Sequence, residues 1–122
     1  MLVKDSKTDD TENDDENIKE DLQEKLQEIK DQEGIIGYIL RGSKSASIDL
    51  KDPTKIIEYA VLSSATFDAG RDMTEALQIG EVDNIVVESE ETKLLSMNVN
   101  SHRISIFMEK SFDHNNLYKN LK

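Results

Sequence analysis

The stretch Gly37-Tyr38-Ile39-Leu40-Arg41-Gly42-Ser43-Lys44-Ser45 comes closer to a chemical motif than any other part of this sequence. A phosphate-binding P-loop has glycines, a lysine and a hydroxyl residue in a similar order, and the helix that follows receives the phosphate at its N-terminus. Here one extra residue separates Gly42 from Lys44, and the alternating residues beyond Ser45 predict a second strand instead of a helix. The stretch is therefore predicted to be a hairpin turn, and nucleotide binding is not expected there.

The other residues capable of chemistry are scattered. The chain has no cysteine, which excludes disulfides, thiolate zinc sites and thiol catalysis. Its two histidines, His102 and His114, stand in polar connections without the spacing of a metal pair, and we expect both to be solvated. The carboxylate pairs Asp9-Asp10 and Glu90-Glu91 fall in predicted disorder or turns, where a solvated carboxylate is a poor general acid. No nucleophile stands in a catalytic motif, so we expect no enzyme activity, no cofactor and no metal.

The acidity of the chain is concentrated near its N-terminus. Residues 1–33 hold 13 acidic and 5 basic side chains, whereas residues 34–122 hold 13 and 10, so net charges of −8 and −3 make up the total of −11. An acidic protein repels phosphate backbones and anionic lipid, so nucleic acid and membrane surfaces are not expected partners. No apolar run approaches the roughly 20 residues that span a membrane, and Met1-Leu2-Val3-Lys4-Asp5 lacks a signal-peptide pattern. By elimination, we expect a cytoplasmic protein without membrane insertion.

The chain divides into an acidic segment and one domain. Residues 1–16 have almost nothing to bury, so we expect them to be disordered. Residues 17–122 form one domain of ordinary size. Its first helix is predicted from Asn17 to Gln32, because apolar residues recur at spacings of 4, 4 and 3 (Ile18, Leu22, Leu26 and Ile29). This narrow stripe predicts a surface helix docked on a sheet.

The remaining elements predict one antiparallel sheet with helices packed on it, an α+β domain. The long helix is capped by Asp52, starts near Thr54 and extends to Phe67 or beyond, with a helical pattern continuing past Gly70 to Gly80. Gly70 either breaks or thins it. In order, we expect strands over Ile35–Leu40 and Ala46–Leu50, the long helix, strands over Asn84–Glu88, Lys93–Val99 and Arg103–Glu109, and a short helix from about Asp113 that docks Leu117 and Leu121.

The long helix carries a wider apolar and small face than one sheet requires. A helix on a single sheet needs one apolar stripe, yet Ile56, Ile57, Ala60, Val61, Ala65 and Phe67 spread over more than that. Either the helix is buried by its own domain alone, or it is shared with a symmetric partner, and we favour the second reading.

The order of elements, and the residues that form them, resemble the Roadblock family, which includes dynein light chains and prokaryotic regulators of Ras-like GTPases. The resemblance covers about residues 17 to 122. It rests on Gly34-Ile35-Ile36-Gly37-Tyr38-Ile39-Leu40 leading into a hairpin, the long helix after Asp52-Pro53, Gly80 before Asn84-Ile85-Val86-Val87-Glu88, and the closing Leu117-Tyr118-Lys119-Asn120-Leu121.

The resemblance implies a profilin-like fold, with a five-stranded antiparallel sheet, the long helix on one face and the N- and C-terminal helices on the other. Family members typically dimerise through the long helix and the strand after it, here Thr54 to Ala69 and Asn84 to Glu88. The dimer interface that this implies comprises Ile57, Ala60, Val61, Ser64, Ala65, Ile85, Val86 and Val87.

Two functions are compatible with such a domain, because family members act as non-catalytic platforms. One is a homodimeric regulatory or scaffold protein that binds a small Ras-like GTPase. The other is a purely structural dimeric adaptor subunit of a larger motor or signalling complex, without nucleotide dependence. In both cases the partner is expected to meet exposed polar residues of the long helix, namely Lys55, Glu58, Ser63 and Arg71.

Overall fold

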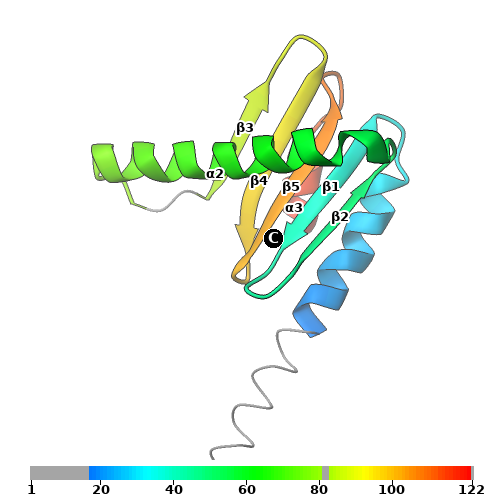
Figure 1. The fold of residues 1–122 in the computed structure, drawn as a ribbon, viewed down its shortest axis with the longest axis horizontal. Helices are drawn as coiled ribbons and strands as arrows, with labels where there is room; N and C mark the ends of the chain where they lie inside the picture. The colour runs from blue at the N-terminus through cyan, green and yellow to red at the C-terminus, as the bar shows by residue number, and fades with distance from the viewer. Residues whose placement is uncertain (1–16, 81–82, 122) are drawn as a thin grey trace, which may run out of the picture.

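The structure is a computed structural model that describes residues 17–80 and 83–121 (Figure 1). The acidic segment 1–16, for which the sequence predicts disorder, lies outside these residues. A five-stranded antiparallel sheet forms the centre, with the strand order β2-β1-β5-β4-β3. The strands are β1 (Ile35–Arg41), β2 (Ala46–Leu50), β3 (Asn84–Glu88), β4 (Thr92–Val99) and β5 (His102–Glu109).

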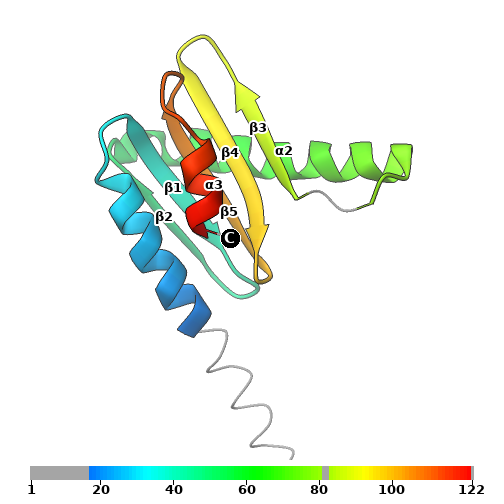
Figure 2. The same cartoon turned by 180° about the vertical axis from the view of Figure 1, so that it is seen from behind.

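Helices cover both faces of this sheet. α2 (Ile56–Leu77), preceded by the short 3₁₀ turn η1 (Pro53–Lys55), crosses one face, as Figure 1 shows. The N-terminal helix (residues 17–30) and α3 (Asn115–Leu121) cover the other face (Figure 2). The α+β class and the placement of the helices are therefore confirmed, and each strand lies within one residue of its predicted bounds.

The larger hydrophobic core lies between the sheet and the two terminal helices. The predicted stripe of the N-terminal helix is confirmed, because Leu22, Leu26 and Ile29 are buried and Ile18 packs against them. β1, β4 and β5 supply the sheet side of this core with Ile35, Tyr38, Leu40, Leu95, Met97, Val99, Ile104, Ile106 and Met108. α3 completes it with Leu117 and Leu121. Burial of this many apolar side chains makes this face the main source of hydrophobic stabilisation.

A smaller core lies beneath the first half of α2. Ile39, Leu50, Leu94 and Phe107 of the sheet are buried there, with three residues of α2 packed against them (Ile56, Tyr59 and Ala60). The rings of Tyr59 and Phe107 lie 4.5 Å apart at a tilt of 41°, a favourable aromatic geometry. Because β1 contributes to both cores, its apolar character on both faces is explained.

Local hydrogen bonds accompany the entry to α2 and its end. Asp52 caps η1, because its carboxylate accepts hydrogen bonds from the hydroxyl (2.6 Å) and the backbone N–H (3.1 Å) of Thr54, and these lower the pKa of the Asp52 carboxyl. The first residue of α2 itself has no side-chain cap. The helix then continues through Gly70 without a break for 22 residues. It ends at Leu77, where Gln78 takes the left-handed conformation (φ 55°) and its N–H bonds the carbonyl of Thr74. The sequence pattern placed this end too late, at Gly80.

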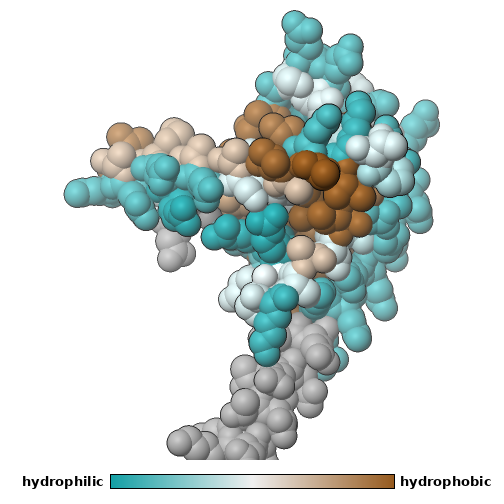
Figure 3. All heavy atoms as spheres, viewed as in Figure 1, coloured by the Kyte–Doolittle hydropathy of each residue, from teal (hydrophilic) through white to brown (hydrophobic). Residues whose placement is uncertain are grey.

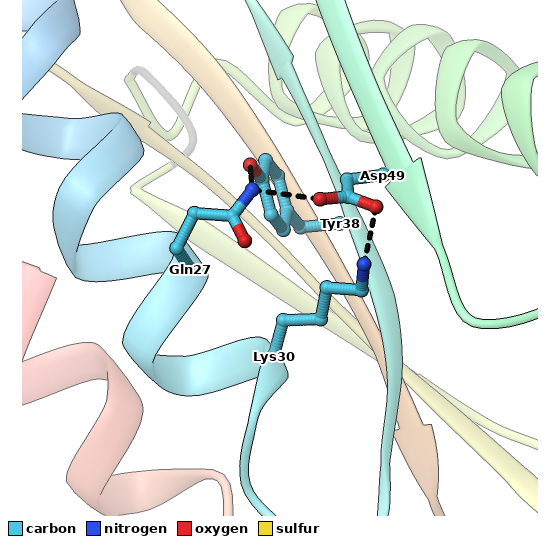
Figure 4. Close-up of polar contacts among 4 residues, drawn as sticks. All are labelled: Gln27, Lys30, Tyr38 and Asp49. Carbon is cyan, nitrogen blue, oxygen red and sulfur yellow. Dashed lines mark hydrogen bonds and ion pairs between the residues drawn. The ribbon is translucent and has the colours of Figure 1, made fainter.

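One side of the N-terminal helix is joined to β2 by polar contacts. Gln23 donates to the hydroxyl of Ser47 (2.8 Å), Gln27 donates to the carboxylate of Asp49 (2.7 Å), and Lys30 forms an ion pair with the same carboxylate (Figure 4). The three helix positions lie on successive turns, and alternate residues of a strand share one face. These contacts therefore fix the register between helix and strand while the apolar stripe supplies the burial.

Tyr38 joins the same polar cluster from β1. Its hydroxyl accepts a hydrogen bond from Gln27 (2.8 Å), and burial of the ring raises the pKa of this hydroxyl (Figure 4). The hydrogen bonds from Lys30 and Gln27 lower the pKa of Asp49, because donors to a carboxylate favour its charged form.

Gly37 allows β1 and β2 to approach closely. A Cβ at this position would lie 2.5 Å from the carbonyl oxygen of Asp49 and 2.7 Å from Cα of Leu50. Both are backbone atoms of the paired strand, so they cannot move aside as a side-chain tip can. This constraint explains a glycine inside a strand whose other residues are all large.

We expect Gly37→Ala to lower the free energy of unfolding by about 2–3 kcal/mol, because the added methyl group must push the two strands apart. Gly42→Ala is the matched control, since a Cβ there would meet the His102 ring at an ordinary 3.4 Å, and it should cost less than about 1 kcal/mol. Urea unfolding followed by circular dichroism measures both values. Equal stability of the two variants would contradict the close approach at Gly37.

Candidate protein-binding surface

Helix α2 extends beyond the sheet that it covers. In Figure 1 its second half runs past β3 with no strand beneath it. Ser63 is the single buried residue of this helix, and the residues that pack on the smaller core all belong to its first turns. Phe67 packs against Arg103, whereas Met73 and Leu77, the other large apolar side chains of the second half, are exposed.

Large exposed apolar side chains are confined to α2, the residues just after it, and β3. Among the described residues they are Ile57, Val61, Leu62, Met73, Leu77, Ile79, Val86 and Val87, with exposed fractions from 36 to 79 %. Figure 3 shows hydrophobic residues gathered where α2 crosses the sheet and continuing along the helix toward its free end. Contiguous exposure of this kind is typical of a binding surface.

A groove of about 510 Å³ separates α2, from Leu62 onward, from β3. Its walls are almost entirely apolar or small, and the helix side is formed by Leu62, Ala65, Thr66, Ala69, Gly70, Met73 and Thr74, with Ile79, Asn84, Ile85 and Val87 opposite. β3 is an edge strand that pairs with β4 alone. An edge strand offers unpaired backbone donors and acceptors, so the groove and the strand together form one surface suited to another protein chain.

Of the residues predicted for the dimer interface, Ala65, Ile85 and Val87 line the groove and Val86 lies on β3, whereas Ile57 and Val61 lie on α2 outside it. Ile57, Val61, Ala65, Val86 and Val87 are exposed, and the half-buried Ile85 lines the groove. Two others face their own domain instead. Ala60 packs against the smaller core, and the Ser64 hydroxyl accepts a hydrogen bond from Arg41 (3.0 Å).

Of the residues predicted to meet a partner, Lys55, Glu58 and Arg71 are exposed and Ser63 is not. Ser63 is only 3 % exposed, and its hydroxyl lies 2.5 Å from that of Ser105, which is 3.3 Å from the hydroxyl of Ser96. The prediction for Ser63 is therefore wrong. The position lies one helical turn after Tyr59 and Ala60, which both face the sheet, and buried hydroxyls need partners of this kind.

The sequence interpretation missed several groove residues. Leu62, Ala69 and Met73 were not assigned to any surface, although with Ala65 they recur at helical spacings of 3, 4 and 4. This spacing marks a second apolar stripe on α2. It was obscured because the first stripe, which faces the sheet, overlaps it in the sequence.

The histidines do not form a chemical site. His102 was predicted to be solvated, but it is buried, and its Nδ1 donates to the carbonyl oxygen of Asn100 (2.9 Å). Gly42 lies beside the ring, since a Cβ at this position would be 3.4 Å from it. His114 is half-buried, also less solvated than predicted. Within residues 17–80 and 83–121 there is no cluster of three histidine, aspartate or glutamate residues that could hold a metal ion.

None of the helices in the described ranges combines the length and apolar composition of a membrane span. The carboxylate pair Glu90-Glu91 is exposed, in the turn between β3 and β4. The stretch from Gly37 to Ser45 turns directly from β1 into β2, with a hydrogen bond from the N–H of Gly42 to the carbonyl of Ser45 (2.9 Å). It is thus a hairpin turn, as predicted.

Comparison with known proteins finds a match among solved structures. Neither the protein-family models nor the curated proteins match the sequence. Among solved structures, the Roadblock/LC7 domain from Streptomyces avermitilis is similar, with a TM-score of 0.61, 17 % sequence identity, and coverage of 81 % of this chain and 83 % of that one. The chain therefore has the Roadblock/LC7 fold.

Proposed function

We propose that this chain is a non-catalytic, homodimeric regulatory or scaffold protein that binds a small Ras-like GTPase. The observation that carries the proposal is the continuous apolar surface formed by the second half of α2 and the edge strand β3. The Roadblock/LC7 fold supports a regulatory domain of this type.

The occupant of the apolar surface is a second copy of the chain. In a two-fold arrangement each β3 pairs with its counterpart, and each α2 places its apolar side along the other α2. Such an isologous contact uses the same residues on both sides. This contact pairs the free backbone donors and acceptors of β3 and covers the groove. Without it, β3 would be an exposed, aggregation-prone edge strand.

The GTPase is expected to meet the outer side of the paired helices. Lys55 and Glu58 are exposed at the start of α2, and Arg71 is exposed on its second half. These charged groups surround the apolar surface without lining the groove itself. Polar groups at the rim of an interface confer specificity and steer association, which suits a regulated partner.

The dimer is tested by a matched pair of substitutions on α2. We expect a mass of about twice the 13.9 kDa chain mass in light scattering at micromolar concentration. Ala65→Glu should weaken association at least about tenfold while leaving the isolated chain folded, because Ala65 is exposed in the groove. Ala60→Glu should instead lower the melting temperature, because Ala60 packs on the core of its own sheet.

The two variants thus separate association from folding. A strictly monomeric chain at every concentration would contradict the dimer. If Ala65→Glu prevents folding and Ala60→Glu does not, then Ala65 faces the sheet and Ala60 faces the partner, opposite to the arrangement described above.

Nucleotide-dependent binding is the test of the GTPase partner. We expect the purified chain to hydrolyse no GTP and to bind a cognate Ras-like GTPase with an affinity that differs between the GDP and GTP forms. Lys55→Glu should weaken this binding about tenfold, whereas Lys25→Glu, on the exposed side of the N-terminal helix, should leave it unchanged. Calorimetric titration in both nucleotide states measures these affinities.

Equal affinity for the GDP and GTP forms would instead assign the chain to the class of structural adaptor subunits. Intrinsic GTP hydrolysis by the chain would overturn the non-catalytic assignment.

A further inference from the structure

All three arginines of the chain gather around one side of α2. Arg41 ends β1, Arg103 lies near the start of β5, and Arg71 is on the second half of α2. Arg41 and Arg103 are direct cross-strand partners in the β1–β5 pairing. The remaining basic side chains, apart from the two histidines, are lysines spread along the sequence, so this is a local concentration of guanidinium groups in an acidic protein.

Contacts with α2 hold two of the guanidinium groups in place. Arg41 donates to the hydroxyl of Ser64 (3.0 Å), and the guanidinium of Arg103 lies over the ring of Phe67, 5.2 Å from its centre. Ser64 and Phe67 are one turn apart, so both arginines approach the same side of the helix. Their heads are therefore oriented before any ligand arrives.

Arg71 extends this site along the helix. Together with Arg103 and Phe67 it lines an open hollow of about 440 Å³, which Thr74, Glu75, Gly80 and Asn98 complete. In the view of Figure 3, hydrophilic residues follow the lower side of α2, away from the hydrophobic patch.

The arginine pair is not neutralised within its own domain. Like charges directly opposite each other on neighbouring strands destabilise a sheet. In residues 17–80 and 83–121 neither Arg41 nor Arg103 forms an ion pair, while Arg71 is paired with Asp68 (3.2 Å) on the exposed surface. Glu75 lines the hollow but, among the described residues, forms no ion pair with either arginine, so an external anion would offset the repulsion between the two guanidinium groups.

We infer that Arg41, Arg71 and Arg103 form a binding site for an acidic segment of a partner protein, which offers carboxylates in succession. The planar guanidinium matches the two oxygens of a carboxylate. The anchor points on the helix run from Ser64 to Arg71, about 10 Å at 1.5 Å per residue. This spread suits successive carboxylates on an extended chain better than a single phosphate, which needs donors that converge on one point.

This site and the groove lie on different sides of α2 but adjoin each other. Ser64 and Arg71 each stand two residues, about 200° around the helix, from the groove residues Leu62 and Ala69. Thr74 lines both the hollow and the groove, and the exposed Ile57, seven residues before Ser64, lies on the arginine side. Peptide binding is therefore read at the arginine side chains themselves, which distinguishes it from association of the chain and from GTPase binding.

Peptide binding to this site can be followed by NMR of the arginine side chains themselves. With three arginines in the full chain, ¹⁵N NMR of the Nε–Hε groups gives one signal for each member of the site. We expect an oligoglutamate peptide to shift the signals of Arg41 and Arg103 saturably, and binding to weaken at least about tenfold between 0.05 and 0.5 M salt. An oligoglutamine peptide of the same length should produce no shift.

Arg41→Ala and Arg71→Ala should each weaken peptide binding by about fivefold or more, and Arg71 is exposed, so its removal leaves folding intact. Lys25→Ala removes the same charge from the N-terminal helix and should change the affinity less than about twofold. Absence of a saturable shift, or equal weakening by Lys25→Ala, would overturn the site. Inorganic phosphate binding as tightly as the peptide at equal ionic strength would overturn the assignment to an acidic segment.

Discussion

The short apolar contact between the first half of α2 and the sheet determines which surfaces this protein leaves free. Ile56, Tyr59 and Ala60 anchor the helix on β1 and β5, and the rest of the helix continues past β3 because nothing in its sequence ends it before Leu77. The opposite face of the sheet is closed by the two terminal helices. The large exposed apolar side chains of the described residues therefore lie on α2, just after it, and on the edge strand β3.

The two sides of α2 differ in chemistry. The side toward β3 is apolar and lined with small residues, which favours close packing with another helix and strand. The other side carries guanidinium groups anchored by Ser64 and Phe67. A helix with both sides available can hold a permanent partner on one and a charged partner on the other, which is how a small platform with no enclosed site would act.

Local patterns predicted most of the fold, whereas side-chain environments depended on contacts across the sheet. The stripe of Leu22, Leu26 and Ile29 and the alternation in the strands placed the elements, since each signal lies within a few neighbouring residues. Ser63 and His102 were misplaced because they lie beside Ser105 and Gly42, respectively, which are far away in sequence. The pairing of Arg41 with Arg103 likewise needs the β1–β5 register, which the sequence alone does not fix.

Hydrogen exchange of the β3 amides that do not pair with β4 tests the central claim most directly. If β3 joins its counterpart in a second copy, these amides are bonded in the dimer and exposed in the monomer, so their protection must rise with protein concentration. Protection in the β1–β5 pairing should stay constant over the same range. Fast exchange of the outer β3 amides at every concentration would contradict a dimer built on this strand.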